Sequence, residues 1–199
     1  MTVIIRDDAF TGLEAAIVLI AFVVVAAVFA YVVLGAGFFT TQKSQETIYK
    51  GIEQASSNIQ IVGQVYGTSS SVSSNLGVES ITFTIGLAPG SPSQDLTKMR
   101  IVWSNETSGP TTYTWVGEMG ELNYGKFMAL DARSGASLTS LVAGNQTVIN
   151  FSAIQGDPPN SNVAGKNSVM TIEIRPAVGA PIPFTRTVPN TISGVMALY

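Results

Sequence analysis

The sequence predicts an α+β protein, with one long N-terminal α-helix followed by an antiparallel β-sandwich or barrel domain of the immunoglobulin-like kind. Three observations lead to this prediction. Residues 15–39 form an apolar run without a charge, and apolar residues then recur at every third or fourth position. Beyond residue 77 the recurrence changes to every second position, which is typical of strands.

The apolar run is long enough to cross a membrane as a helix. Its 25 residues would extend about 37 Å at about 1.5 Å per residue, against a hydrocarbon thickness of about 30 Å. The apolar core of a cleaved secretory signal has only about 7–15 residues. We therefore expect a transmembrane helix.

The helical spacing continues past the apolar run. Polar side chains occupy the opposite face, so this second part is amphipathic. It is expected to end near Tyr66, with Gly67 as a stop signal. The apolar residues at helical spacing are Ile48, Ile52, Ala55, Ile59 and Val62. The stretch 48–65 would form the underside of the β domain or, alternatively, a coiled-coil seam with another copy.

A polar hinge at 67–77 separates the helix from the β domain. Beyond it, short runs of alternating apolar and polar residues predict strands, and clusters of Gly, Pro, Asn and Ser between them predict turns. Six or seven such strands favour a sandwich or barrel. The runs are 81–87, 99–103, 113–115, 149–151, 170–174 and 182–188.

Composition excludes several classes of function. The chain has no Cys and no His, so disulfides, Cys or His metal ligands and triads that need His are absent. Charged residues make up 12% of the chain without a basic patch, which argues against nucleic acid as a partner. The acidic loop residues Asp95, Glu106, Asp131 and Asp157 form no dense calcium-loop pattern. We expect neither an enzyme nor a bound cofactor.

The N-terminal sequence resembles a known family. "MTVIIRDDA" resembles a short charged leader, and "FTGLEAAIVLIAF" resembles the mature start of a type IV pilin, with Phe first and Glu fifth. The Ala/Val-rich segment, followed by Gly-x-Gly and a Thr/Gln-rich stretch, is similar to an archaellin, the archaeal flagellin. Phe10 and Glu14 are the more pilin-like features, so an archaeal adhesion pilin is the alternative.

The resemblance implies a division of the chain and a set of partners. It implies a leader at 1–9, a helix at 10–66 with a filament-core part at 10–39 and an amphipathic part at 40–66, and a globular β domain at 67–199. A prepilin-type signal peptidase would cut between Ala9 and Phe10 while the helix spans the membrane. A membrane platform and an assembly ATPase would then add subunits to an extracellular filament that rotates for swimming.

Glu14 is the one carboxylate near the start of the apolar helix. Cleavage would remove Arg6, Asp7 and Asp8 and create an α-ammonium on Phe10. Glu14 lies one helical turn away, so it is expected to pair with its own N-terminus or with that of a neighbour, since an unpaired charge at membrane depth is costly. The alternative is a solvated acid near the headgroups.

Three sequons offer acceptors for covalent N-glycans, which an oligosaccharyltransferase would attach. They begin at Asn105, Asn145 and Asn150. Asn105 and Asn145 lie in turn-like stretches, and Asn150 alternates with apolar neighbours, so its side chain should face outward from its strand. We expect at least one of the three to be glycosylated.

Overall fold

The computed structural model describes the backbone of residues 5–69, 77–107, 109–117, 124–153 and 163–199, and the side chains from residue 11 onward. The chain divides into two compact units, Met1–Lys50 and Gly51–Tyr199.

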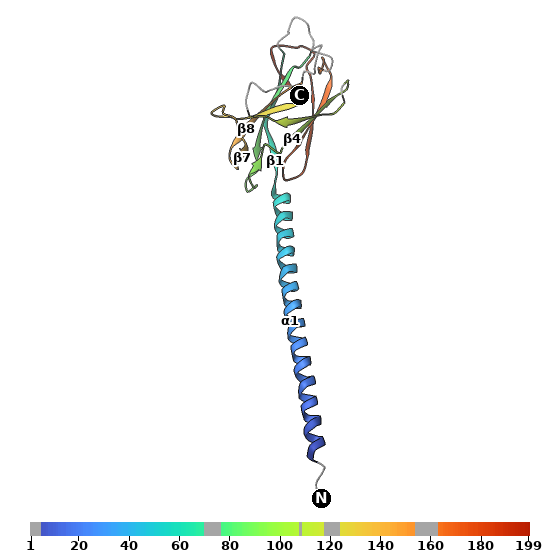
Figure 1. Ribbon diagram of the computed structural model, residues 1–199. Coiled ribbons are helices and arrows are strands. Elements are labelled where there is room, and N and C mark those ends of the chain that lie inside the picture. Colours follow the sequence, from blue (N-terminus) through green and yellow to red (C-terminus); the bar gives the residue numbers. More distant parts are fainter. Residues whose placement is uncertain (1–4, 70–76, 108, 118–123, 154–162) are drawn as a thin grey trace. The chain divides into compact units, whose positions relative to one another are not determined.

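The long helix predicted from the sequence is present as α1, Ile5–Ser56 (Figure 1). Its 52 residues correspond to about 78 Å of helix. The part from Thr11 to Ser56 is long and apolar enough to cross a membrane, with a mean hydropathy of 3.2 in its most apolar window. The length and composition of α1 therefore agree with the predicted transmembrane helix.

The prediction that the helix continues to residue 66 is wrong. Strand β1 occupies Ile59–Thr68, and alternation along it buries Ile59 and Val65 while Gln60 and Tyr66 are exposed. The Ser-Ser-Asn triplet at 56–58 consists of poor helix formers that favour caps and turns. Ile59 begins a stretch rich in β-branched residues, which favour strands. The first strand of the β domain therefore lies inside the range assigned to the helix.

Two further expectations about this region also fail. Ile52 is 58% exposed and Val65 is fully buried as a strand residue, so 48–65 is not one helical face beneath the β domain. The polar hinge predicted at 67–77 begins inside β1, which runs to Thr68, and residues 70–76 of that hinge lie outside the described residues.

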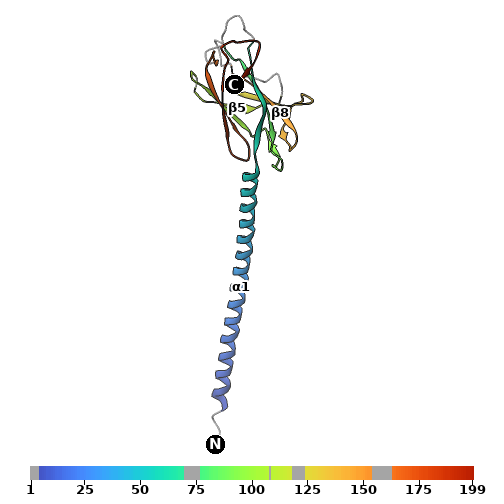
Figure 2. The same ribbon diagram turned by 180° about the vertical axis from the view of Figure 1, so that it is seen from behind.

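The β domain is built around a nine-stranded sheet with the order β10-β9-β4-β5-β6-β8-β2-β1-β11 (Figures 1 and 2). A separate pair joins β3, Gln94–Asp95, to β7, Ser140–Leu141. The other strands of the large sheet are β2 Ser80–Leu87, β4 Arg100–Asn105, β5 Thr111–Trp115, β6 Lys126–Asp131, β8 Gln146–Ser152, β9 Val169–Arg175, β10 Ile182–Thr187 and β11 Val195–Leu198.

The six predicted strand runs correspond to β2, β4, β5, β8, β9 and β10, while β1, β6 and β11 were not predicted as strands. The pairing is antiparallel as predicted, except between β5 and β6, where Thr114 and Trp115 pair in parallel with Lys126 and Phe127. A parallel pair needs a crossover connection, which alternation alone does not indicate.

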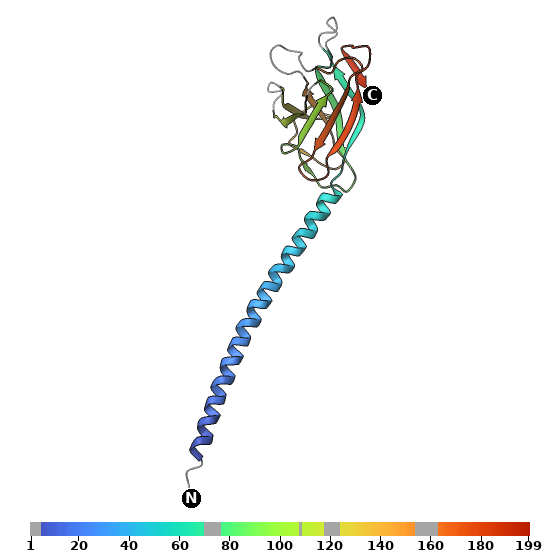
Figure 3. The same cartoon turned by 90° about the vertical axis from the view of Figure 1, so that its right-hand side faces the viewer.

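The two end strands of the sheet meet each other. The backbone N–H of Thr187, at the end of β10, donates to the carbonyl of Tyr199, and the N–H of Tyr199 donates to the carbonyl of Thr187. Figure 3 shows several strands of the β domain running side by side. The sheet is therefore nearly closed at this point, which confirms the predicted sandwich or barrel class.

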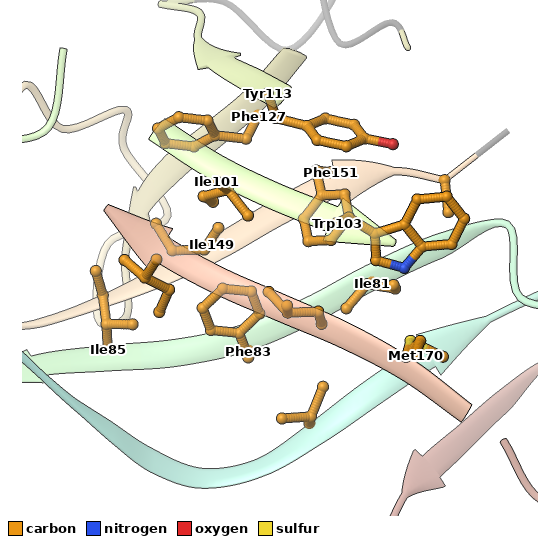
Figure 4. Packing of buried hydrophobic residues seen from close by; sticks show 14 of the residues in the cluster. Ile81, Phe83, Ile85, Ile101, Trp103, Tyr113, Phe127, Ile149, Phe151 and Met170 are labelled. Carbon is orange, nitrogen blue, oxygen red and sulfur yellow. The ribbon is translucent and has the colours of Figure 1, made fainter. Parts of the chain in front are cut away.

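The core lies inside this nearly closed sheet and is rich in aromatic residues (Figure 4). Phe151 on β8 contacts Tyr113 on β5, with ring centroids 4.6 Å apart, and Phe83 on β2, at 6.4 Å. Trp103 on β4 is fully buried. Because the chain has no Cys, the domain depends on this burial in place of disulfides.

A small polar network surrounds the point where α1 ends and β1 begins. The hydroxyl of Ser57 donates to the carbonyl of Val178 at 2.6 Å and accepts from Nε2 of Gln94 at 2.6 Å, and Oε1 of Gln94 accepts from the backbone N–H of Val178 at 3.3 Å. Gly179 has a φ of +120°, and a Cβ there would lie 2.9 Å from the carbonyl oxygen of Ser57. The start of β1 is therefore held by a closed ring of hydrogen bonds.

Candidate functional site

The surface of α1 is the first candidate site, because its apolar side chains have nothing to pack against within the described residues of one chain. The large apolar residues between 13 and 39 are each more than half exposed, including Phe22 at 71% and Phe29 at 70%. Apolar surface on this scale is unfavourable in water, at about 25 cal/mol per Å². The helix therefore requires a bilayer or other helices around it.

Small residues lie between the large apolar side chains of α1 at intervals. Gly35 and Gly37 have no atom within 4 Å of the position of an added Cβ, so both face open space. The hydroxyl groups of Thr40 and Thr41, one turn later, donate to the carbonyls of Ala36 and Gly37 at 2.8 and 2.9 Å. Small residues allow a neighbouring helix to approach closely. Because the two hydroxyl groups already donate within their own helix, a neighbouring helix need not supply an acceptor for them.

A charged cluster follows the apolar part of α1. Glu46 accepts hydrogen bonds from Lys43 at 2.7 Å and from Lys50 at 2.6 Å. The hydrogen bond from Lys43, and then that from Lys50, hold the pKa of Glu46 below its ordinary value. These solvent-exposed pairs are each weak, but they mark where the helix surface changes from apolar to charged.

Glu14 is exposed on the first described turns of α1. The predicted cleavage residues Ala9 and Phe10 lie in the helical backbone that begins at Ile5, and their side chains lie outside the described residues. In the uncut chain the nitrogen of Phe10 is an amide, so the predicted pair with Glu14 cannot form before cleavage.

The first sequon lies at the end of β4. Asn105 is half-buried, and its Oδ1 accepts from the backbone N–H of Thr107 at 3.2 Å and from the hydroxyl of Thr107 at 3.3 Å. Thr107 is exposed. The acceptor residue of this sequon is thus partly exposed, and its hydroxyl residue lies at the surface of the folded domain.

The hydroxyl residues of the other two sequons are less exposed than Thr107, since Thr147 is buried and Ser152 is half-buried. Asn145 is exposed in the turn before β8, but Thr147 is fully buried, and its hydroxyl has no hydrogen-bond partner among the described residues. Asn150 is half-buried between the buried Ile149 and Phe151, and its Oδ1 accepts from the hydroxyl of Ser80 at 2.9 Å. The three sequons share one motif, but they differ in the exposure of their acceptor and hydroxyl residues.

The loop acids give no sign of a metal centre. Oδ1 of Asp95 accepts a hydrogen bond from the backbone N–H of Thr97 at 3.0 Å. Oδ1 of Asp131 accepts one from the backbone N–H of Arg133 at 2.7 Å. Asp157 lies outside the described residues. In the part of the chain that the structure describes, no three Asp or Glu side chains are grouped so that they could hold a metal ion.

An exposed apolar N-terminal helix joined to a self-contained β domain agrees with the architecture of a pilin-like filament subunit. The chain belongs to the archaeal-type flagellin family, whose model matches residues 9–186. A probable flagellin of Archaeoglobus fulgidus, "Probable flagellin 1", is 36% identical over 97% of this chain and 96% of its own length.

Solved structures agree with this assignment. The archaeal flagellum of Methanospirillum hungatei strain JF1 matches with a TM-score of 0.71 and 36% identity, covering 94% of this chain and 98% of that chain. The archaeal flagellin FlaB1 of Methanocaldococcus jannaschii, at 14% identity and a TM-score of 0.56 over 71% of this chain and 96% of its own, supports the fold alone. The chain is thus a structural subunit of the archaeal flagellum, and the pilin alternative gains no support.

Proposed function

We propose that the mature chain polymerises through α1, so that the helices form the filament core and the β domains form the wall of an extracellular filament that rotates for swimming. The observation that carries this proposal is the exposure of the large apolar side chains along residues 13–39 of the helix. Lipid tails and neighbouring helices solvate such a surface about equally well, so the hydrophobic transfer term nearly cancels between membrane and filament. Packing at small residues such as Gly35 and Gly37 then favours association.

Before assembly, the chain is a precursor anchored in the membrane by α1. A prepilin-type signal peptidase cuts between Ala9 and Phe10, and a membrane platform with an assembly ATPase adds the mature subunit to the base of the filament. The role is structural and not catalytic, which agrees with a family of filament subunits.

N-terminal sequencing of filaments sheared from cells tests this proposal directly. The expected result is a filament protein that begins with Phe10, and cells without the gene should lose swimming while surface attachment is retained. A filament protein that still begins at Met1, or cells that swim normally without it, would contradict the proposal.

Glu14 serves as an assembly contact in this scheme. After cleavage its carboxylate lies one turn from the new α-ammonium of Phe10, and pairing removes the cost of two isolated charges in an apolar core. Glu14→Gln keeps the size and polarity but removes the charge, and should lower the filament yield strongly. Glu53→Gln is the matched control, because Glu53 is exposed at the far end of the same helix. Equal yields from both variants would show that the charge of Glu14 is not needed.

Asn105 is the proposed acceptor of an N-glycan, attached by an oligosaccharyltransferase. What favours it over the other two sequons is the exposure of Thr107 and the position of the acceptor at the end of a strand. The proposed function uses no bound cofactor.

A further inference from the structure

Charge divides the large sheet into two halves. Four consecutive strands in the sheet order, β8, β2, β1 and β11, contain no charged residue. The charged residues of the large sheet all lie on β4, β6, β9 and β10, and are Arg100, Lys126, Asp131, Glu173, Arg175 and Arg186.

Exposed apolar side chains gather at one end of the uncharged half. Val195 on β11 is 66% exposed, Tyr199 directly after β11 is 70% exposed, and Tyr66 on β1 is 44% exposed. The register pairs Tyr66 with Ala197, so these side chains lie on one outward surface. We refer to Val62, Tyr66, Val195, Ala197 and Tyr199 as the β1–β11 face.

The fold itself does not require this face to be apolar. The alternate residues of the same strands, Val65, Met196 and Leu198, already point inward and are buried in the core. An antiparallel sheet with one face in water normally carries polar and charged residues at its outward positions. Aromatic residues in a surface depleted of charge are instead typical of the centre of a protein–protein interface.

We propose that the β1–β11 face docks on a second copy of this chain in the filament. A second copy is available as a partner only if the chain polymerises as proposed above. Polymerisation repeats every surface of the subunit at close spacing, and a face whose side chains carry no charge brings no like-charged side chains together in such an array. A lipid surface is the rival partner, but peripheral membrane binding draws on Lys and Arg near the apolar residues, and the four strands have none.

The absence of Cys from the chain allows a direct test. Val195→Cys places one thiol on the β1–β11 face, and Val142→Cys places one at a position that is 50% exposed and outside the face. Each full-length variant is labelled with a water-soluble maleimide in sheared filaments and after dissociation in detergent. We expect the thiol at 195 to react at least about tenfold more slowly in filaments than after dissociation, since the centre of an interface excludes water. The thiol at 142 should react at similar rates in both.

Equal labelling of the thiol at 195 in filaments and in dissociated subunits would overturn the proposal, and so would equal protection of both positions. Protection in membrane vesicles that disappears in filaments would assign the face to lipid instead. Failure of the unmodified chain to form filaments would contradict the proposed function, which is a separate outcome. As a second measurement, Val195→Lys should make filaments dissociate at a lower temperature, whereas Val142→Lys should not.

Discussion

Replacing Gln94 tests how firmly the start of β1 is held. Gln94 is 2% exposed, donates to the hydroxyl of Ser57 at 2.6 Å and accepts from the backbone N–H of Val178 at 3.3 Å. Gln94→Leu keeps a similar volume but removes both hydrogen bonds. Ser57 still donates to the carbonyl of Val178, so the N–H of Val178 is the group left without a partner.

The size of the effect follows from these contacts. Two hydrogen bonds contribute about 0.5–1.5 kcal/mol each, and the unpaired amide moves the cost toward the upper end of that range. The apolar burial of leucine offsets part of it, so we expect the free energy of unfolding of the β domain to fall by about 2 kcal/mol. For a domain of this size, that corresponds to a Tm lower by about 6–8 °C.

Intrinsic fluorescence provides the assay, because both tryptophans of the chain, Trp103 and Trp115, lie in the β domain. Urea unfolding of the full-length chain in mild detergent is followed at the tryptophan emission maximum. Gln60→Leu is the matched control, since Gln60 is exposed on β1, and its effect should stay within about 0.5 kcal/mol. A loss below about 0.5 kcal/mol for Gln94→Leu would refute the view that this ring of hydrogen bonds stabilises the domain.

Three further predictions concern single side chains. Asn105→Gln should remove a glycan from the mass of the filament protein, whereas Asn145→Gln should leave that mass unchanged. Tyr113→Phe should leave the free energy of unfolding unchanged or raise it by up to about 1 kcal/mol in urea unfolding, because the buried Tyr113 hydroxyl has no hydrogen-bond partner among the described residues. The side-chain carboxyl of Glu46, followed by NMR, should titrate below its ordinary pKa of 4.5 and move back toward it in about 1 M salt, where screening acts over about 3 Å. Because its folded pKa is lowered, the contribution of Glu46 to helix stability is present above pH 4.5 and is lost as the pH falls through the lowered value.

The sequence predicts most strands because their alternation is plain, and it fails where two patterns overlap. Ile59 and Val62 continue the helical spacing of Ile48 and Ile52, although they belong to a strand. The signal that could have separated them is the Ser-Ser-Asn triplet at 56–58, which favours a helix end over a helix interior. Helical spacing of apolar residues is therefore weaker evidence for a continuing helix than a cap or turn residue within the spacing is for a helix end.

Strand β6 shows a different reason for failure. Phe127, Met128 and Ala129 are consecutive and all buried, so the strand has no alternation to detect. Both of its faces are covered, and it forms the parallel pair with β5. Continuous apolar runs of this kind are typical of parallel strands and cannot be distinguished from a buried helix by period alone.

The sequon at Asn145 could have been judged from the sequence. Thr147 has the same parity as Ile149 and Phe151, the residues expected to point into the core, and the structure buries all three. The position of the hydroxyl residue relative to the strand period is thus informative about a sequon. In contrast, the closure of the sheet at Thr187 and Tyr199 depends on two segments whose pairing no local pattern indicates.

The division of charge and the proposed glycan acceptor agree on one orientation of the β domain in a filament. A water-exposed protein surface relies on interspersed charges for solubility, and the charged strands of this sheet include β4 and β9, where Arg175 forms a two-point ion pair with Glu173 at 2.9 and 3.0 Å. Asn105 ends β4, on the same half of the sheet. The glycan proposed for Asn105 would have to extend into water, so we expect the β4–β9 half to face the solvent, which leaves the β1–β11 face available to a neighbouring copy.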